Sequence, residues 1–158
     1  MKKILIVNSN YYKIISKNLL INAKKKLLLA KYSIKSIDVP GVFEVPISIR
    51  RNITKFDAFV VLGCVIKGET PHFDFICSST FNAILKLSTD FNKPISNGVI
   101  TALNMSQAIN RSTKSSFKKP NKGAEAANAI ISILKNVPKK NLKILHRELK
   151  LFKKYITH

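Results

Sequence analysis

The stretch "FDAFVVLGCVI" at residues 56–66 leaves few folds open to this chain. Its side chains are apolar on both faces of an extended backbone, which is typical of a parallel strand buried in the middle of a sheet. Such a strand requires a layer of helices on each side of its sheet. The centre of the sequence therefore favours an α/β protein.

The rest of the chain alternates between strand-like and helix-like patterns. Further strands are expected at residues 3–7, 32–39 and 94–101, and helices at 13–32, 72–91, 104–112 and 121–135. The segment 43–53 is mixed, because Pro46 fits either the first turn of a helix or a break in a strand. Alternation of this kind predicts a three-layer α/β/α sandwich around a central parallel four-stranded sheet.

The residues from Pro138 onward follow a different pattern. The sequence "KKNLKILHRELKLFKKYITH" predicts an amphipathic basic helix. Its apolar face consists of Leu142, Leu145, Leu149, Phe152 and Ile156. Either this helix packs on a neighbouring subunit, or it contacts a membrane surface or RNA. We expect an α/β domain at 1–137 and a basic helical extension at 138–158.

The charge of the chain is strongly positive. Its 158 residues, enough for one domain, include 28 Lys and Arg against 8 Asp and Glu, a formal charge of +20. Such a field attracts nucleic acid, acidic membranes and phosphorylated small molecules. A general abundance of Lys, Ile and Asn would also produce it. Because no zinc-finger spacing and no aromatic stacking motif accompanies the charge, we expect no dedicated nucleic-acid or membrane partner.

Three features of the sequence favour a cytoplasmic location. Cys64 and Cys77 are the only cysteines and lie in apolar segments, as in a reduced protein rather than a secreted disulfide framework. No apolar run approaches the ~20 residues of a membrane span. The N-terminal "MKKILIVNSNYY" has a short apolar run and no small-residue cleavage site, so it predicts a first strand rather than a signal peptide.

The stretch "GCVIKGETPHFDF" (63–75) places polar residues where a ligand is expected. In open α/β sheets, ligands bind beyond the carboxyl ends of the strands, where helix N-termini point. Thr70 is expected to cap the next helix and Pro71 to occupy its first position, so that free amides attract an anion. His72 can take up and release protons near pH 7. The residues fit equally well with a histidine that stands at the start of a helix and has no chemical role.

Three blocks of sequence occur in the order and spacing of a known family. They are "VPGVFEVP" (39–46), "DAFVVLGCVIKGETPHFDFIC" (57–77) and "NKGAEAA" (121–127). Together they resemble the lumazine synthases over roughly residues 3 to 135, which implies a flavodoxin-like fold. This family makes 6,7-dimethyl-8-ribityllumazine in the penultimate step of riboflavin synthesis. It condenses 5-amino-6-(D-ribitylamino)uracil with 3,4-dihydroxy-2-butanone 4-phosphate, releasing phosphate and water, without metal or organic cofactor.

The resemblance implies a binding site for ribitylaminouracil. The matching residues are Tyr11, Val42, Phe43, Glu44, Cys64, Val65 and Ile66. Tyr11 corresponds to the aromatic residue that stacks on the pyrimidine ring. The segment 42–44 corresponds to the part that holds the ribityl chain, where the carboxylate of Glu44 can accept hydrogen bonds from hydroxyl groups. The backbone of residues 64–66 corresponds to the part that reads the uracil edge.

The resemblance also implies a phosphate site and a catalytic residue. Glu69 and Thr70 match the turn that binds the butanone phosphate, and Arg111 matches an arginine whose guanidinium clamps the same phosphate. His72 matches the proton-transfer residue, which favours the functional interpretation of this histidine. A lumazine- or flavin-binding carrier without turnover is the alternative, but a carrier has no need for a proton shuttle.

Three features depart from the family pattern. Asn97 stands where many members carry an aromatic residue that reaches over the substrate ring from the adjoining subunit, and we expect only its backbone to contact the uracil substrate. The loop "STKSSFKKP" is longer than usual, so the loop lysine of the family corresponds to Lys114, Lys118 or Lys119, whereas Lys122 matches a later lysine that contacts substrate. The basic C-terminal helix is absent from typical members.

The family assembles as rings of five subunits with active sites between neighbours, either free or as shells of twelve rings. Shell-forming members resemble one another in having a short loop before the last helix. Here the segment 112–123 is lengthened and carries four lysines, so we expect a free homopentamer rather than a 60-subunit shell. Repulsion between pentamers of high charge favours the same outcome. Riboflavin synthase is a candidate protein partner.

Overall fold

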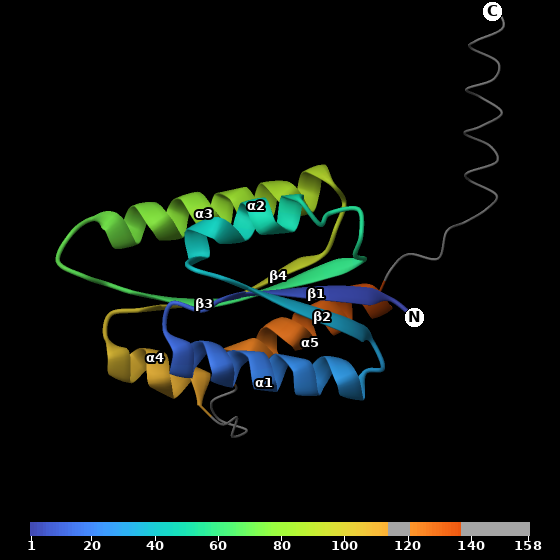
Figure 1. The fold of residues 1–158 in the computed structure, drawn as a ribbon, viewed down its shortest axis with the longest axis horizontal. Coiled ribbons are helices and arrows are strands. Elements are labelled where there is room, and N and C mark those ends of the chain that lie inside the picture. Colours follow the sequence, from blue (N-terminus) through green and yellow to red (C-terminus); the bar gives the residue numbers. More distant parts are fainter. Residues whose placement is uncertain (114–120, 137–158) are drawn as a thin grey trace, which may run out of the picture.

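The computed structural model describes residues 1–113 and 121–136 (Figure 1). The elements within these ranges are β1 (Lys3–Ser9), α1 (Lys13–Leu29), β2 (Ser33–Val39), the 3₁₀ turn η1 (Val42–Glu44), α2 (Val45–Arg50), β3 (Ala58–Ile66), α3 (His72–Asp90), β4 (Ile95–Ala102), α4 (Met105–Ser112) and α5 (Lys122–Lys135). The predictions for the loop lysines Lys114, Lys118 and Lys119 and for the helix at 138–158 lie outside the described residues.

The four strands form one parallel sheet in the order β2-β1-β3-β4. The central strand β3 pairs with β1 on one side and with β4 on the other, so that Val60 lies between Ile6 and Ser96. The direction of winding reverses between β1 and β3, and ligands bind beyond the carboxyl ends of strands at such a reversal. β4 is an edge strand. The predicted parallel four-stranded sheet is confirmed.

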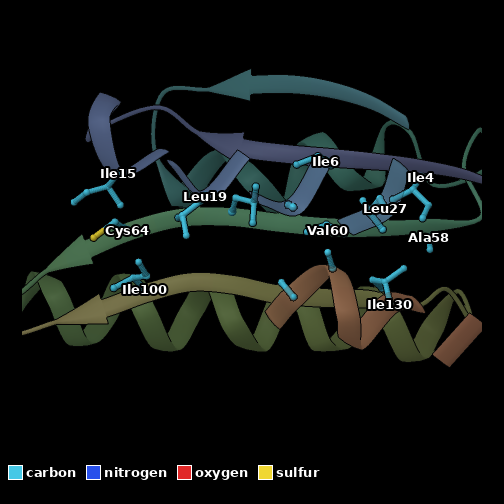
Figure 2. Packing of buried hydrophobic residues seen from close by; sticks show 14 of the residues in the cluster. Ile4, Ile6, Ile15, Leu19, Leu27, Ala58, Val60, Cys64, Ile100 and Ile130 are labelled. Carbon is cyan, nitrogen blue, oxygen red and sulfur yellow. The ribbon is translucent and has the colours of Figure 1, made fainter. Parts of the chain in front are cut away.

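Helices cover both faces of the sheet, as the apolar strand at 56–66 required. α1, α4 and α5 lie on one face, and α2 and α3 lie on the other (Figure 1). Alternate side chains of each strand point to opposite faces. Ile6 and Val60 therefore join the cluster under α1 and α5 (Figure 2), whereas Val7 and Val61 join the cluster under α2 and α3. The three-layer sandwich is confirmed.

The end of α1 differs from the prediction for a backbone reason. α1 stops at Leu29 instead of residue 32, because Lys31 adopts a left-handed conformation with φ of 60°. Its N–H donates to the carbonyl of Leu28, and the N–H of Tyr32 donates to that of Leu27, which closes the helix. The ambiguous segment 43–53 contains the turn η1 and then α2, with Pro46 in the first turn of that helix.

α3 begins at residue 72 as predicted, but its expected N-cap was wrong. Pro71, not Thr70, is the N-cap, with helical φ and ψ of −64° and −3°, and Thr70 makes no side-chain capping bond. The ring of Pro71 fixes its φ near the helical value. Its carbonyl accepts hydrogen bonds from Asp74 and Phe75 at 3.0 and 3.3 Å. His72 is consequently the first residue of the helix.

Candidate active site

A cavity of about 260 Å³ lies beyond the carboxyl ends of β1, β2 and β3, and we call it the β3 cavity. Its lining residues are Tyr11, Tyr12, Gly41, Val42, Phe43, Cys64, Val65, Ile66, His72 and Ile76. They come from four separate parts of the chain: the turns after β1 and β2, the end of β3 and the first turns of α3. The fold thus brings seven of the predicted site residues to one place, His72 among them.

Close packing of the side chains of Val42 and Ser9 against Gly63 holds the β3 cavity together. A Cβ atom on Gly63 would lie 2.8 Å from Cγ1 of Val42 and 2.9 Å from Cβ of Ser9, both closer than van der Waals contact allows. Only glycine lets the end of β1 and the turn η1 approach β3 this closely. Val42 is consequently buried against the sheet, and Phe43 beside it stays exposed at the cavity.

Two tyrosine rings form one wall of the β3 cavity. The ring centroids of Tyr11 and Tyr12 are 4.9 Å apart, with an angle of 74° between the planes. This edge-to-face arrangement is a favoured one for aromatic pairs and fixes the orientation of Tyr11. Burial, with a smaller contribution from Tyr11, raises the pKa of Tyr12 above its ordinary value. Tyr11 itself is 71% exposed and offers an aromatic surface to a ligand.

Cys64 lies at the apolar floor of the β3 cavity. Burial, assisted by the nearby Cys77, raises the pKa of the Cys64 thiol to about 11. The thiol therefore stays protonated near neutral pH and is a poor nucleophile. Cys64 lines the cavity near the end of β3, and the backbone role implied by the resemblance stays a prediction.

The carboxylate of Glu44 makes a hydrogen bond within the chain. Its Oε2 accepts a hydrogen bond of 3.0 Å from the N–H of Gly41, which closes the turn that lines the β3 cavity. Glu44 lies outside the lining of both cavities described here, whereas its neighbours Val42 and Phe43 line the β3 cavity. Glu69 and Thr70 are exposed in the turn between β3 and α3, also outside the cavity lining.

A second cavity, of about 630 Å³, lies along the edge strand and is called the β4 cavity. It is lined by Phe81, Asn97, Val99, Ile100, Thr101, Ala102, Gln107, Asn110, Arg111 and Lys122. Three predicted site residues, Asn97, Arg111 and Lys122, therefore meet here. Among the described residues none lines both cavities, so one chain holds its predicted site in two parts.

Asn121 fixes the two cationic residues of the β4 cavity relative to each other. Its Oδ1 caps α5 by accepting from the N–H groups of Gly123 and Ala124 at 2.9 and 3.1 Å. Its Nδ2 donates to the carbonyl of Ser112, one residue after Arg111. The side chain is fully buried and so ties the end of α4 to the start of α5. The cap could be read from an asparagine before a helix, but no sequence signal indicated the bond to Ser112.

The polar groups of the β4 cavity are partly engaged within the chain. The Nζ atom of Lys122 lies 3.1 Å from Oε2 of Glu125, one turn further along α5. The Oδ1 atom of Asn97 accepts a hydrogen bond of 2.9 Å from the N–H of Val99. Arg111, at the end of α4, is exposed. Its guanidinium is the cation of this cavity best suited to an incoming anion.

Two negative findings concern residues 1–113 and 121–136. No group of three or more His, Cys, Asp or Glu side chains is placed there to hold a metal ion. No helix there has both the length and the apolar character needed to cross a bilayer.

Comparison with known proteins gives one consistent result. The family model described as 6,7-dimethyl-8-ribityllumazine synthase matches residues 1–137. A protein of that name from Campylobacter jejuni subsp. doylei is 39% identical over 137 residues, covering 84% of this chain and 87% of the relative. A namesake from Buchnera aphidicola is 37% identical over 147 residues, covering 89% and 90%. One from Methylorubrum populi is 34% identical over 139 residues, covering 84% and 80%. The chain belongs to the 6,7-dimethyl-8-ribityllumazine synthase family.

Proposed function

We propose that the β3 cavity of one subunit and the β4 cavity of its neighbour together form each active site. The reaction of this chain is that of its family, the condensation of 5-amino-6-(D-ribitylamino)uracil with 3,4-dihydroxy-2-butanone 4-phosphate to the lumazine, phosphate and water. The observation that carries the proposal is the separation of His72 from Arg111, which line different cavities of the same chain. Neither cavity alone contains all the groups that the chemistry needs.

Size and exposure support a site shared between subunits. Ligand sites commonly occupy ~300–1,000 Å³, so the β3 cavity, at about 260 Å³, is small for two substrates. Two large aromatic side chains that line it are open to solvent, with Tyr11 71% and Phe43 63% exposed in the single chain. Exposed apolar surface of this extent marks an interaction site. A neighbouring subunit would cover it and complete the cavity.

In this proposal the β3 cavity holds ribitylaminouracil. The ring of Tyr11 stacks on the pyrimidine, and backbone groups of residues 64–66 bind its polar edge. The turn η1 and the carboxylate of Glu44 receive the ribityl chain, with Glu44 keeping its bond to Gly41 through one oxygen. A carboxylate has two oxygens and about four acceptor positions, so both contacts can exist together. Asn97 of the neighbour contacts the same substrate from the β4 side.

The butanone phosphate lies where the two cavities meet. The guanidinium of Arg111, assisted by Lys122, binds the phosphate from the β4 cavity. Glu69 and Thr70, in the exposed turn before α3, contact it from the other subunit, together with amides of the first turn of α3. This arrangement puts the leaving phosphate beside His72, whose imidazole can transfer the protons required during phosphate loss and ring closure.

The assembly that follows is a ring in which every subunit contributes both halves. We propose a free homopentamer in the cytoplasm, because the lengthened loop 112–123 and the charge of +20 per chain oppose the packing of rings into a shell. We propose from the sequence pattern a division of the chain into a domain at 1–137 and a basic extension at 138–158. Riboflavin synthase, which would consume the product, is the proposed protein partner.

A subunit-mixing experiment tests the shared site. His72→Ala and Arg111→Ala chains are each purified, then unfolded, mixed in equal amounts and reassembled. If the halves come from different subunits, a site is intact when an Arg111→Ala chain supplies His72 and a His72→Ala chain supplies Arg111. Random mixing makes about a quarter of the sites intact, because each of two neighbours must be the right variant. Activity that stays at the level of the separate variants would refute the shared site.

Light scattering on the same samples tests the assembly. A mass near five chains supports the free ring, and a mass near sixty chains contradicts it. A monomer that is fully active would contradict the shared site as well.

A further inference from the structure

We propose that Phe81, on α3, supplies the ring-covering surface that Asn97 lacks. The inference rests on the shared active site proposed above: Phe81 of one subunit lies over the face of the pyrimidine ring held in the β3 cavity of its neighbour. Phe81 lines the β4 cavity beside Asn97 and is the aromatic residue among the described lining residues. No motif in the sequence indicated a role for it.

Phe81 and Asn97 lie on the same side of the sheet. Side chains two apart on a strand share a face, so Asn97 points toward the face that also carries Val99. Val99 belongs to the core cluster under α2 and α3, and Phe81 packs against the same cluster from α3. Phe81 is half-buried, which means that one part of its ring is anchored and another part is free to line the cavity. An anchored ring loses little further entropy when a ligand covers it.

The side chain of Asn97 is poorly suited to stack on the substrate. Its amide oxygen already accepts the N–H of Val99 at 2.9 Å, which holds the amide close to its own strand. The aliphatic residues of the cavity, such as Ile100, are buried and offer little surface. A uracil ring has an extended π-face, and an aromatic side chain is the preferred partner for such a face. Phe81 is thus placed to stack on the pyrimidine ring, as an aromatic residue at position 97 would.

Tyr11 stacks on the opposite face of the pyrimidine ring in this proposal. Tyr11 is 71% exposed in the single chain, so it contributes one aromatic surface and leaves the other side of a bound ring uncovered. Phe81 of the neighbouring subunit would close that side. The pyrimidine would then lie between two aromatic rings from two subunits, while Arg111 in the cavity of Phe81 holds the phosphate of the second substrate.

Steady-state kinetics of Phe81→Leu and Phe81→Ala test this role. Leucine keeps much of the apolar volume, so Phe81→Leu is expected to fold even if the alanine variant does not. We expect the KM for ribitylaminouracil to rise about tenfold, from the loss of one aromatic stacking contact. The KM for the butanone phosphate and kcat should change less than about twofold, because Phe81 touches neither the phosphate nor a reacting atom. Restoring an aromatic ring by Asn97→Phe in the Phe81→Leu background should recover most of the affinity.

Phe91→Ala is the matched control. Phe91 lies just after the end of the same helix, is 39% exposed and packs under the guanidinium of Arg50 at 4.7 Å, outside both cavities. Neither KM should change in this variant. An unchanged uracil KM in Phe81→Leu would overturn the inference. Equal rises in both KM values would overturn it too, because they would indicate a packing role.

The mixing experiment separates this inference from the proposal on which it rests. Phe81→Leu is added either to the His72→Ala chain, which supplies the β4 cavity of an intact site, or to the Arg111→Ala chain, which supplies the β3 cavity. The KM for ribitylaminouracil of the recovered activity should rise only when Phe81→Leu is in the His72→Ala chain, which supplies the β4 cavity. Recovery with equal KM values in both cases overturns the role of Phe81. No recovery before Phe81 is changed overturns the shared site instead.

Discussion

The two cavities differ in what holds them in shape. In the β3 cavity the side chains of Val42 and Ser9 pack tightly against Gly63, and most of the lining comes from the end of β3 and the turns after β1 and β2. The β4 cavity is lined by residues of the edge strand β4 and of the helices α3, α4 and α5, and one buried amide, that of Asn121, joins α4 to α5. The shape of the first should depend on the absence of a side chain at position 63. The second should depend on individual hydrogen bonds.

The cavities also differ in chemistry. The β3 cavity has tyrosine rings, aliphatic side chains and a thiol whose pKa is raised to about 11 by burial. The β4 cavity contains an exposed guanidinium and an ammonium group. Apolar surface suits the flat ring of one substrate, and fixed cations suit the phosphate of the other. Each half of the site should therefore control a different substrate.

The largest expected effect is that of His72→Ala, in the β3 cavity. We expect kcat to fall about a hundredfold, at the low end of the ~10²–10⁴-fold typical of general acid–base catalysis. The fall is limited because condensation still proceeds slowly once both substrates are held together. Binding of ribitylaminouracil, measured by calorimetry, should be almost unchanged. A normal kcat would remove His72 from the mechanism and leave the β3 cavity a binding site only.

Arg111→Ala should give the next largest effect, and only on the other substrate. Loss of a hydrogen bond to a charged group costs roughly 1.5–3 kcal/mol, or about tenfold to a hundredfold in the KM for the butanone phosphate. The affinity for ribitylaminouracil should stay the same. Arg111→Lys should recover part of the loss, because lysine keeps the charge but not the two-pronged geometry. Equal losses of affinity for both substrates would mean that the two cavities do not bind different substrates.

The β3 cavity could be predicted from sequence to a greater extent than the β4 cavity. Its residues lie within or beside the apolar strand at 56–66 and the block 39–46, where burial on both faces leaves a clear pattern. The N-cap of α3 was nevertheless assigned to the wrong residue, because Pro71 adopts that position with a helical backbone. The early end of α1 at Lys31 was equally hidden, since a left-handed lysine carries no signal of the kind that glycine gives.

The β4 cavity depends on contacts that no local pattern reveals. Phe81 sits in a helix where an apolar residue is expected in any case, and only the packing of α3 beside β4 shows that it reaches a cavity. Asn121 bonds to Ser112, nine residues earlier, across the segment 114–120. The bond between Glu44 and Gly41 likewise could not be read from residue type. Side-chain partners of this kind are decided by the tertiary structure.

Asn121→Ala should show that the β4 cavity depends on one amide. The change removes two capping bonds and leaves the carbonyl of Ser112 without its buried donor, so the free energy of unfolding should fall by about 2 kcal/mol. Asn104→Ala is the matched control. Asn104 also caps a helix, but it is exposed and accepts one bond, from Gln107 at 3.0 Å. Its loss should cost about 1 kcal/mol or less. Equal costs in a denaturant titration would mean that the link to Ser112 contributes nothing.

The smallest expected effect concerns the buried floor of the β3 cavity and is a dependence of stability on pH. The thiol of Cys64 has an ordinary pKa of 9.0 and a folded-state pKa of about 11. Between these values the unfolded chain gives up the thiol proton while the folded chain keeps it, so alkaline pH stabilises the unfolded state. This thiol has no effect on stability below about pH 8. Its contribution should lower the free energy of unfolding by about 1 kcal/mol at pH 10.

Comparing wild type with Cys64→Ser isolates this contribution, because the serine hydroxyl does not ionise in this range and Cys77 remains in both proteins. Denaturant titrations of the two proteins at pH 8 and pH 10, at one protein concentration, give the difference. The wild type should lose about 1 kcal/mol more than the variant between the two pH values. Equal losses would mean that water reaches Cys64 in the folded protein. The β3 cavity would then be as wet as the β4 cavity, and the contrast between an apolar ring site and a charged phosphate site would not hold.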